Sequence, residues 1–290
     1  MRLPSQRDAS MFKRLFRNNP EKAEMSFFDH LEELRWHIIR SLIAVGVASV
    51  LIFIFISPIY SKVILGPTRS NFITFRVLCK LDHWLHLGSR LCAAHMNIKF
   101  QNLEVSGQFM LALTSSLILG IIAAVPLILW EFWRFVKPAL KANEAKYTRG
   151  VVFWSSLQFF MGVFFAYFCI APYAMSFFSN YHISTQFENI FTIQSYLDLV
   201  IQLVVGLGCV FELPILVYFL TKVGILTPQF LRTYRKQAIL VIVGIAAFIA
   251  PPDVTSQIVV SVPLYLLYEI SIYISRRVMS RKEADEKKWV

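Results

Sequence analysis

Two short polar segments carry carboxylates where the surrounding sequence is basic and borders a long apolar run. The first, 26–35, reads SFFDHLEELR and places Glu32 and Glu33 just before an apolar stretch. Lysine or arginine would suit the anionic face of a membrane better than glutamate. These acids therefore favour binding of a basic partner, although Arg35 and Arg40 could balance them in an ordinary solvated turn.

The same segment is predicted to form an amphipathic helix. Ser26 and Asp29 have the spacing of a capping box, and Leu31 and Leu34 fall on one helical face. We expect residues 1–35 to form a polar N-terminal segment that ends in a helix at the membrane interface.

A second segment, 135–146, reads FVKPALKANEAK and sets Glu144 among lysines. Lys141 and Lys146 lie close enough along the chain to neutralise Glu144 locally. By itself this segment is a weak indication of a site. It repeats the pattern of Glu33, a carboxylate beside a predicted membrane span.

Polar residues inside predicted spans form a third group. Gln202 and Glu212 lie in the fourth span and Glu269 lies in the sixth. An ionisable group at mid-membrane costs about 2.5 to 3.5 kcal/mol, so each needs a partner or a wet cavity. Glu212, followed by Pro214, is the better candidate for a functional groove, whereas we expect Glu269 to pair with Arg276.

The remaining candidates are cysteines and histidines of one connection. Cys79 and Cys92 lie near His83, His86 and His95, a composition that could ligate zinc, but the spacing fits no closed zinc pattern. In an oxidising compartment the two cysteines could instead form a disulfide. The sequence has no phosphate loop, nucleophile elbow or HExxH motif, so it supports neither catalysis nor a cofactor.

The composition requires lipid as the solvent. Of 290 residues, 56% are apolar and 16% charged, and the mean hydropathy is +0.56. The apolar residues fall in blocks close to the roughly 20 residues that cross a bilayer as a helix. We predict an all-α polytopic membrane protein with spans at 36–57, 109–134, 150–171, 196–220, 237–250 and 257–274.

The distribution of charge predicts the topology. The net charge is +11, but the basic residues flank the apolar blocks and form no single stripe, which argues against nucleic-acid binding. Seven Lys and Arg lie in 1–35 and six in the tail 275–290, while 172–195 and 251–256 carry none. The positive-inside rule therefore places both termini in the cytoplasm.

One connection departs from this rule. Residues 58–108 are predicted to lie outside, yet they carry the basic residues Lys62, Arg69, Arg76, Lys80, Arg90 and Lys99. Charge governs translocation weakly in loops of this length, so we expect an extracytoplasmic cap with a helix within 72–91.

The last two spans are short for a bilayer. The turn PPDVTS at 251–256 joins 237–250 to 257–274 in a tight hairpin. Such a hairpin requires local thinning of the bilayer or burial among neighbouring helices.

Several landmarks occur in one order along the chain: HLEELR at 30–35, WRFVKPAL at 133–140 followed by Glu144, FELP at 211–214, RTYR at 232–235, PPDVTSQ at 251–257 and LYE at 267–269. Together they resemble the TatC family, the receptor and core subunits of the twin-arginine protein export system, from about residue 26 to 277. Departures are Ala250, where many relatives have threonine, and a long outer loop.

The resemblance implies a fold and a site. The fold would be six transmembrane helices in a concave cupped bundle with cytoplasmic termini and two short final helices. A cytoplasmic groove would receive the twin-arginine motif, with Glu33 and Glu144 as acceptors. The other residues implied are Leu34, Arg35 and Phe135 beside the acceptors, Glu212 and Gln202 in the intramembrane groove, and Pro67, Pro138, Asp253 and Gln257 in structural or translocation roles.

The resemblance also implies partners and a location. These are twin-arginine signal peptides of folded cargo, single-span TatA/TatB-type subunits, further copies of the chain, and the lipid of a bacterial cytoplasmic (inner) membrane, with translocation driven by the proton-motive force.

Two other functions are weighed against this one. A secondary transporter or proton channel would use Glu212 as a relay and needs a second charge facing it, for which the sequence offers only Gln202 and Asp198. A metal or thiol redox enzyme would use Cys79, Cys92 and the nearby histidines.

Overall fold

The structure is a computed structural model that describes residues 27–85, 98–136, 148–184, 186, 189–250 and 254–287. It is almost entirely helical over these residues. Five described helices are long and apolar enough to cross a membrane: Leu31–Ile54, Gly107–Val136, Gly150–Asn180, Ile193–Val223 and Ser256–Lys282. The predicted all-α, multi-pass class is therefore confirmed.

The described elements follow one another along the chain as helices joined by short π-helical or 3-10 turns and one pair of strands. They are α2 (Phe27–Ile54), α3 (Ile56–Ile59), η1 (Tyr60–Ile64), η2 (Gly66–Thr68), α4 (Ile73–Leu85), β1 (Phe100–Gln101), α5 (Gly107–Val136), α7 (Thr148–Phe165), η4 (Ala166–Ile170), α8 (Ala171–Asn180), β2 (Phe191–Thr192), α9 (Ile193–Phe211), α10 (Leu213–Val223), α11 (Pro228–Thr233), α12 (Arg235–Ile249) and α13 (Val254–Lys287).

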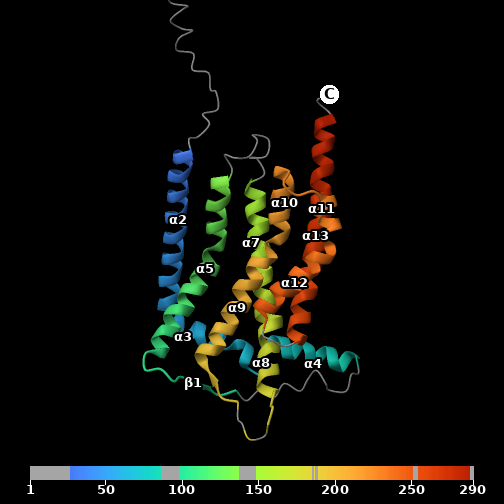
Figure 1. Cartoon of the computed structure of the whole chain (residues 1–290). Helices are drawn as coiled ribbons and strands as arrows, with labels where there is room; N and C mark the ends of the chain where they lie inside the picture. Colours follow the sequence, from blue (N-terminus) through green and yellow to red (C-terminus); the bar gives the residue numbers. More distant parts are fainter. Residues whose placement is uncertain are drawn as a thin grey trace, which may run out of the picture.

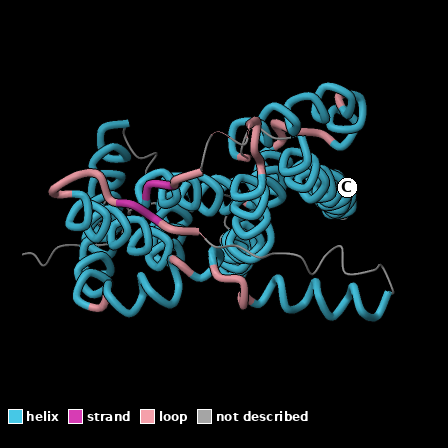
Figure 2. Tube along the Cα trace, turned by 90° about the horizontal axis from the view of Figure 1, so that it is seen from below, coloured by secondary structure: helices cyan, strands magenta, loops and turns pink. Residues whose placement is uncertain are grey.

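The long helices stand side by side in a bundle (Figure 1). The start of α2 and the end of α13 lie at the same end of the bundle, which we call the terminal end. At the opposite end α4 runs crosswise, and β1 pairs in parallel with β2, Phe100 opposite Phe191 (Figures 1 and 2). The helix predicted within 72–91 is confirmed by α4.

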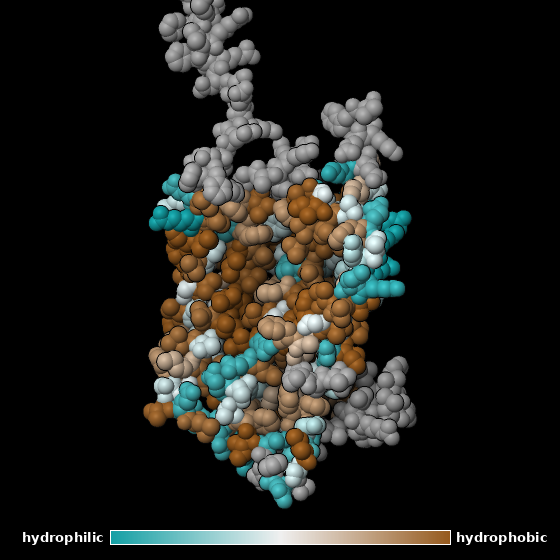
Figure 3. Space-filling view, viewed as in Figure 1, coloured by the Kyte–Doolittle hydropathy of each residue, from teal (hydrophilic) through white to brown (hydrophobic). Residues whose placement is uncertain are grey.

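The surface of the bundle suits a lipid solvent. Apolar side chains cover most of the middle of the face in Figure 3. On α2, Leu42, Ile43 and Val47 are 64%, 60% and 57% exposed. A soluble monomer rarely leaves so continuous an apolar surface in water. The buried core lies instead between α5, α7, η4 and α9 and includes Leu203 and Leu207.

Two residues determine where α10 begins and ends. Pro214 has no N–H to donate, and the helix that began as α9 breaks at Glu212 before continuing as α10. Gly224 ends α10 in the left-handed region at φ 90°, where its lack of a Cβ removes the steric cost, and the N–H of Ile225 returns to the carbonyl of Leu220 at 2.9 Å.

The helix bounds correct three sequence predictions. The expected interfacial helix before residue 36 is the first part of α2, because no glycine or proline interrupts 27–45. The third span continues through η4 into α8. Of the last two helices only α12 is short, at 15 residues, while α13 has 34 because its Lys- and Glu-rich end continues the helix beyond the apolar run.

Candidate functional site

Glu33 is a half-buried carboxylate near the terminal end of α2. Its Oε2 atom is buried and has no hydrogen-bond partner among the described residues. An unpaired buried carboxylate oxygen is costly, and a cationic donor would relieve that cost. Leu34 beside it is half-buried, whereas Arg35 and Glu32 are exposed. The adjacent carboxylates therefore lie in different environments.

One turn along α2, His37 links this helix to α5. His37 Nδ1 lies 2.5 Å from Glu131 Oε2, and the side chains are 7% and 15% exposed. Arg40 Nη1 approaches the same carboxylate oxygen at 3.7 Å. The aromatic ring of Phe135 meets the His37 ring edge to face, with centroids 6.1 Å apart. The predicted Phe135 thus contacts His37, which lies one helical turn from the predicted Glu33 on α2.

A close helix contact supports this arrangement deeper in the bundle. A Cβ placed on Gly120 of α5 would lie 2.8 Å from both the backbone N and Cα of Ser49 of α2. Only glycine allows the backbones to approach so closely, which is how helices commonly pack in membranes. The position of Glu33 therefore depends on α2–α5 contacts of two kinds, polar and steric.

The intramembrane candidates lie on other helices. Glu212, at the break between α9 and α10, accepts a hydrogen bond from the hydroxyl of Ser155 on α7 through Oε2, and Oε1 is buried without a partner among the described residues. Gln202 donates through Nε2 to the carbonyl of Phe248 on α12 at 2.5 Å. The structure therefore gives these two residues separate partners.

Two further predicted residues have structural contacts. Pro67 is fully buried in η2. Gln257 donates through Nε2 to the carbonyl of Val243 at 3.3 Å, which joins α13 to α12.

Glu269 does not pair as predicted. It accepts from Arg235 Nη2 at 2.8 Å and from the Tyr265 hydroxyl at 3.1 Å, and not from Arg276. The reason is tertiary, since the packing of α12 on α13 brings Arg235 closer to Glu269 than a residue two turns along its own helix.

Four predicted site residues, Glu144, Pro138, Asp253 and Cys92, lie outside the described residues. Cys79 is disulfide-bonded, but its pairing with Cys92 stays a prediction. Among the described residues there is no group of three or more His, Cys, Asp or Glu that could hold a metal ion.

The sequence reasoning missed His37, Glu131 and Ser155. Glu131 offered a signal, because it is an ionisable residue inside the predicted span 109–134 and lies one helical turn before Phe135. His37 and Ser155 offered none, since each acquires its role from a residue on another helix.

Comparison with known proteins identifies similar chains. A family model described as Sec-independent protein translocase protein (TatC) matches residues 29–263. The chain is 38% identical over 264 residues to the Sec-independent protein translocase protein TatC of Blattabacterium sp. subsp. Periplaneta americana, covering 90% of this chain and 99% of the relative. The Aquifex aeolicus protein of the same description is 31% identical, with 91% and 100% covered.

The fold is similar to that of solved structures as well. A crystal structure described as the twin-arginine translocase receptor TatC in DDM superposes with a TM-score of 0.67 at 32% identity, covering 85% of this chain and 99% of that one.

Proposed function

Because the chain belongs to the TatC family of Sec-independent protein translocase proteins, we propose that it is the receptor for twin-arginine signal peptides of folded precursor proteins. The terminal end of the bundle is the cytoplasmic end, as the positive-inside bias predicts. Together with α12, the five long helices form a six-span, cupped bundle in a bacterial inner membrane.

The observation that carries this proposal is the buried carboxylate oxygen of Glu33, which has no hydrogen-bond partner in the part of the chain that the structure describes. A guanidinium can donate two parallel hydrogen bonds to one carboxylate, which a lysine ammonium cannot reproduce. Adjacent arginines of a signal peptide would engage Glu33 and Glu144, and Phe135 would pack beside them. A charged hydrogen bond in a shielded site is worth about 1.5 to 3 kcal/mol, against about 0 to 1 for an exposed pair.

His37, Arg40 and Glu131 have a different role in this proposal. His37 already hydrogen-bonds Glu131 and Arg40 lies within ion-pair distance of it, so this carboxylate is occupied and positions α2 on α5. Glu33, by contrast, has a buried carboxylate oxygen with no hydrogen-bond partner among the described residues. Single-span partner subunits would pack against α9, α10 and α12, and the proton-motive force would drive their recruitment.

The transporter alternative gains no support from the described contacts. The described partner of Glu212 is the neutral hydroxyl of Ser155, and no charged group is found paired with it in the part of the chain that the structure describes.

The test uses a matched pair of carboxylates. Glu33→Gln should weaken binding of a twin-arginine precursor to the protein in membrane vesicles by about tenfold to a hundredfold. Glu32→Gln should leave binding close to that of the unchanged protein, since Glu32 is exposed. The Glu33→Ala/Glu144→Ala variant should abolish site-specific crosslinking of the precursor.

A precursor in which both arginines are lysines provides the second control and should bind the unchanged protein weakly. Equal loss of binding in Glu32→Gln and Glu33→Gln, with membrane insertion intact, would contradict the role given to Glu33.

A further inference from the structure

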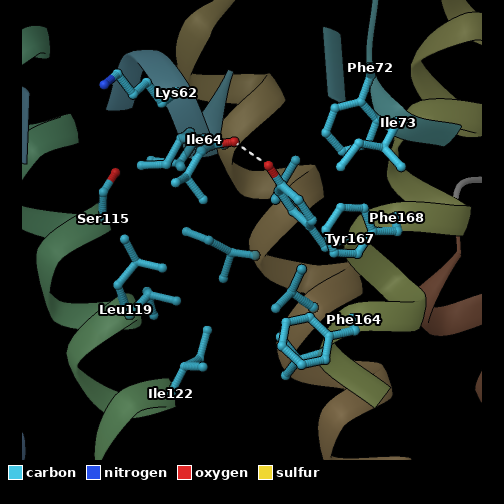
Figure 4. A pocket seen from close by; sticks show the side chains of 17 residues that line it. Lys62, Ile64, Phe72, Ile73, Ser115, Leu119, Ile122, Phe164, Tyr167 and Phe168 are labelled. Carbon is cyan, nitrogen blue, oxygen red and sulfur yellow. Dashed lines mark hydrogen bonds between the residues drawn. The ribbon is translucent and has the colours of Figure 1, made fainter. Parts of the chain in front are cut away.

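A cavity of about 410 Å³ lies near the end of the bundle opposite the termini. Its walls come from α5, α7, η4 and α9, and η1 and the first turn of α4 close it at one end. The 17 lining residues are apolar except for Lys62, Ser115 and Tyr167. Figure 4 shows Leu119 and Ile122 of α5 facing Phe164 across this space.

The interior of the cavity offers little to a polar ligand. The Tyr167 hydroxyl already donates to the carbonyl of Val63 at 2.5 Å (Figure 4), and Ser115 is only 2% exposed. Cavities lined by such side chains stay dry and take up apolar molecules. The interior is therefore suited to hydrocarbon.

The edge of the cavity is cationic. Lys62 is exposed and its amine points away from the apolar interior (Figure 4). The guanidinium of Arg69 donates through Nη2 to the carbonyl of Ser61, the residue next to Lys62. These are two of the basic residues of the connection 58–108 that the charge bias of the other segments leaves unexplained.

We propose that this cavity binds an anionic phospholipid, with one acyl chain between α5 and α7 and the phosphate at Lys62 and Arg69. The apolar walls match a hydrocarbon chain and the cations at the edge match a phosphate, a combination that a phospholipid offers in one molecule. Two adjacent cations select an anionic headgroup over a zwitterionic one.

The experiment measures labelling by photoreactive lipids and needs neither a signal peptide nor a partner subunit. The purified full chain is reconstituted in phosphatidylcholine vesicles with a trace of phosphatidylglycerol whose acyl chain carries a diazirine. A parallel sample contains diazirine-labelled phosphatidylcholine with the same chains. Attachment sites are mapped by mass spectrometry. We expect cavity residues such as Leu119 and Val200 to be labelled, and phosphatidylglycerol to label them more than phosphatidylcholine does.

Two pairs of variants distinguish recognition of the lipid headgroup from binding of the acyl chain. Lys62→Gln should lower the preference for phosphatidylglycerol about fivefold, whereas Lys99→Gln, an exposed lysine of the same connection outside the cavity, should not. Ile122→Trp should fill the cavity and remove labelling there. Leu117→Trp should leave the labelling unchanged, because Leu117 is 45% exposed on the same helix and does not line the cavity.

Equal labelling of the unchanged protein by the two lipids would overturn the proposal. So would capture of a protein, in place of lipid, by a photoreactive amino acid at position 122 in native membranes. Lys62→Gln keeps the test valid should Ile122→Trp fail to fold.

Discussion

Replacing Gly120 by alanine should separate α2 from α5. The new Cβ would lie 2.1 Å from Ser49 Oγ and 2.8 Å from the backbone N and Cα of the same residue. Carbon atoms in contact prefer about 3.5 to 4.0 Å, so one helix must move by roughly 1 Å. A side-chain rotation can relieve the Oγ contact but not the two backbone contacts. Overpacking of this kind costs about 1 to 3 kcal/mol.

Gly46→Ala is the matched control for this substitution. Gly46 lies on α2, and a Cβ there would have nothing within 4 Å. Both substitutions gain the same intrinsic preference of alanine for the helix, about 1 kcal/mol, so their difference isolates the packing cost.

The assay is reversible unfolding in mixed micelles, titrated with a denaturing detergent and followed by circular dichroism. We expect Gly120→Ala to be less stable than Gly46→Ala by about 1 to 3 kcal/mol. Ser49→Gly in the Gly120→Ala background should restore only part of the loss, because the backbone contacts remain. Equal stability of Gly120→Ala and Gly46→Ala would refute the close contact as the determinant of α2 packing.

Two other substitutions give predictions in the same assay. Glu131→Ala leaves the buried His37 without its partner and should lower the free energy of unfolding by about 1.5 to 3 kcal/mol. Glu131→Gln keeps an acceptor oxygen and should lower it less. A larger loss of stability for Glu131→Gln than for Glu131→Ala would count against the pairing. The alanine of Gly224→Ala must adopt φ 90°, which should lower the stability by about 1 to 2 kcal/mol, and Gly224→Asn should lower it less. An unchanged midpoint of unfolding for Gly224→Ala would contradict the left-handed end of α10.

The sequence predicts the helices better than it predicts the contacts between them. Apolar blocks locate α5 and α12 closely, because hydrocarbon thickness and backbone hydrogen bonding leave a helix as the available structure. Pro214 predicts the break after Glu212 by a local rule, the missing N–H. The end of α13 was misjudged because hydropathy indicates where lipid stops, and a polar helix can continue past that point.

The pairs of charged and polar side chains could be identified only from the structure. Glu131 and His37 are 94 residues apart, and Glu269 and Arg235 are 34 apart, so each pair depends on how two helices pack. Local spacing predicted Arg276 as the partner of Glu269, and it predicted no partner for Glu131. Glu33 was identified from its unusual charge beside a membrane span, which is a property of one segment and needs no tertiary contact.

The packing of α2 explains why its few polar and small residues matter for the proposed receptor site. Its contacts with the described elements are made mainly with α5, and apolar residues such as Leu42 and Val47 remain exposed on its surface. In lipid, burial of those residues provides no driving force for association, because lipid chains are as apolar as leucine. The steric contact at Gly120 and the polar pair between His37 and Glu131 therefore help to hold α2 in place, beside ring contacts such as that of Phe53 with Phe109. Since Glu33 lies one turn before His37, a change at either contact moves the carboxylate relative to Phe135 and should weaken peptide binding without altering the carboxylate itself.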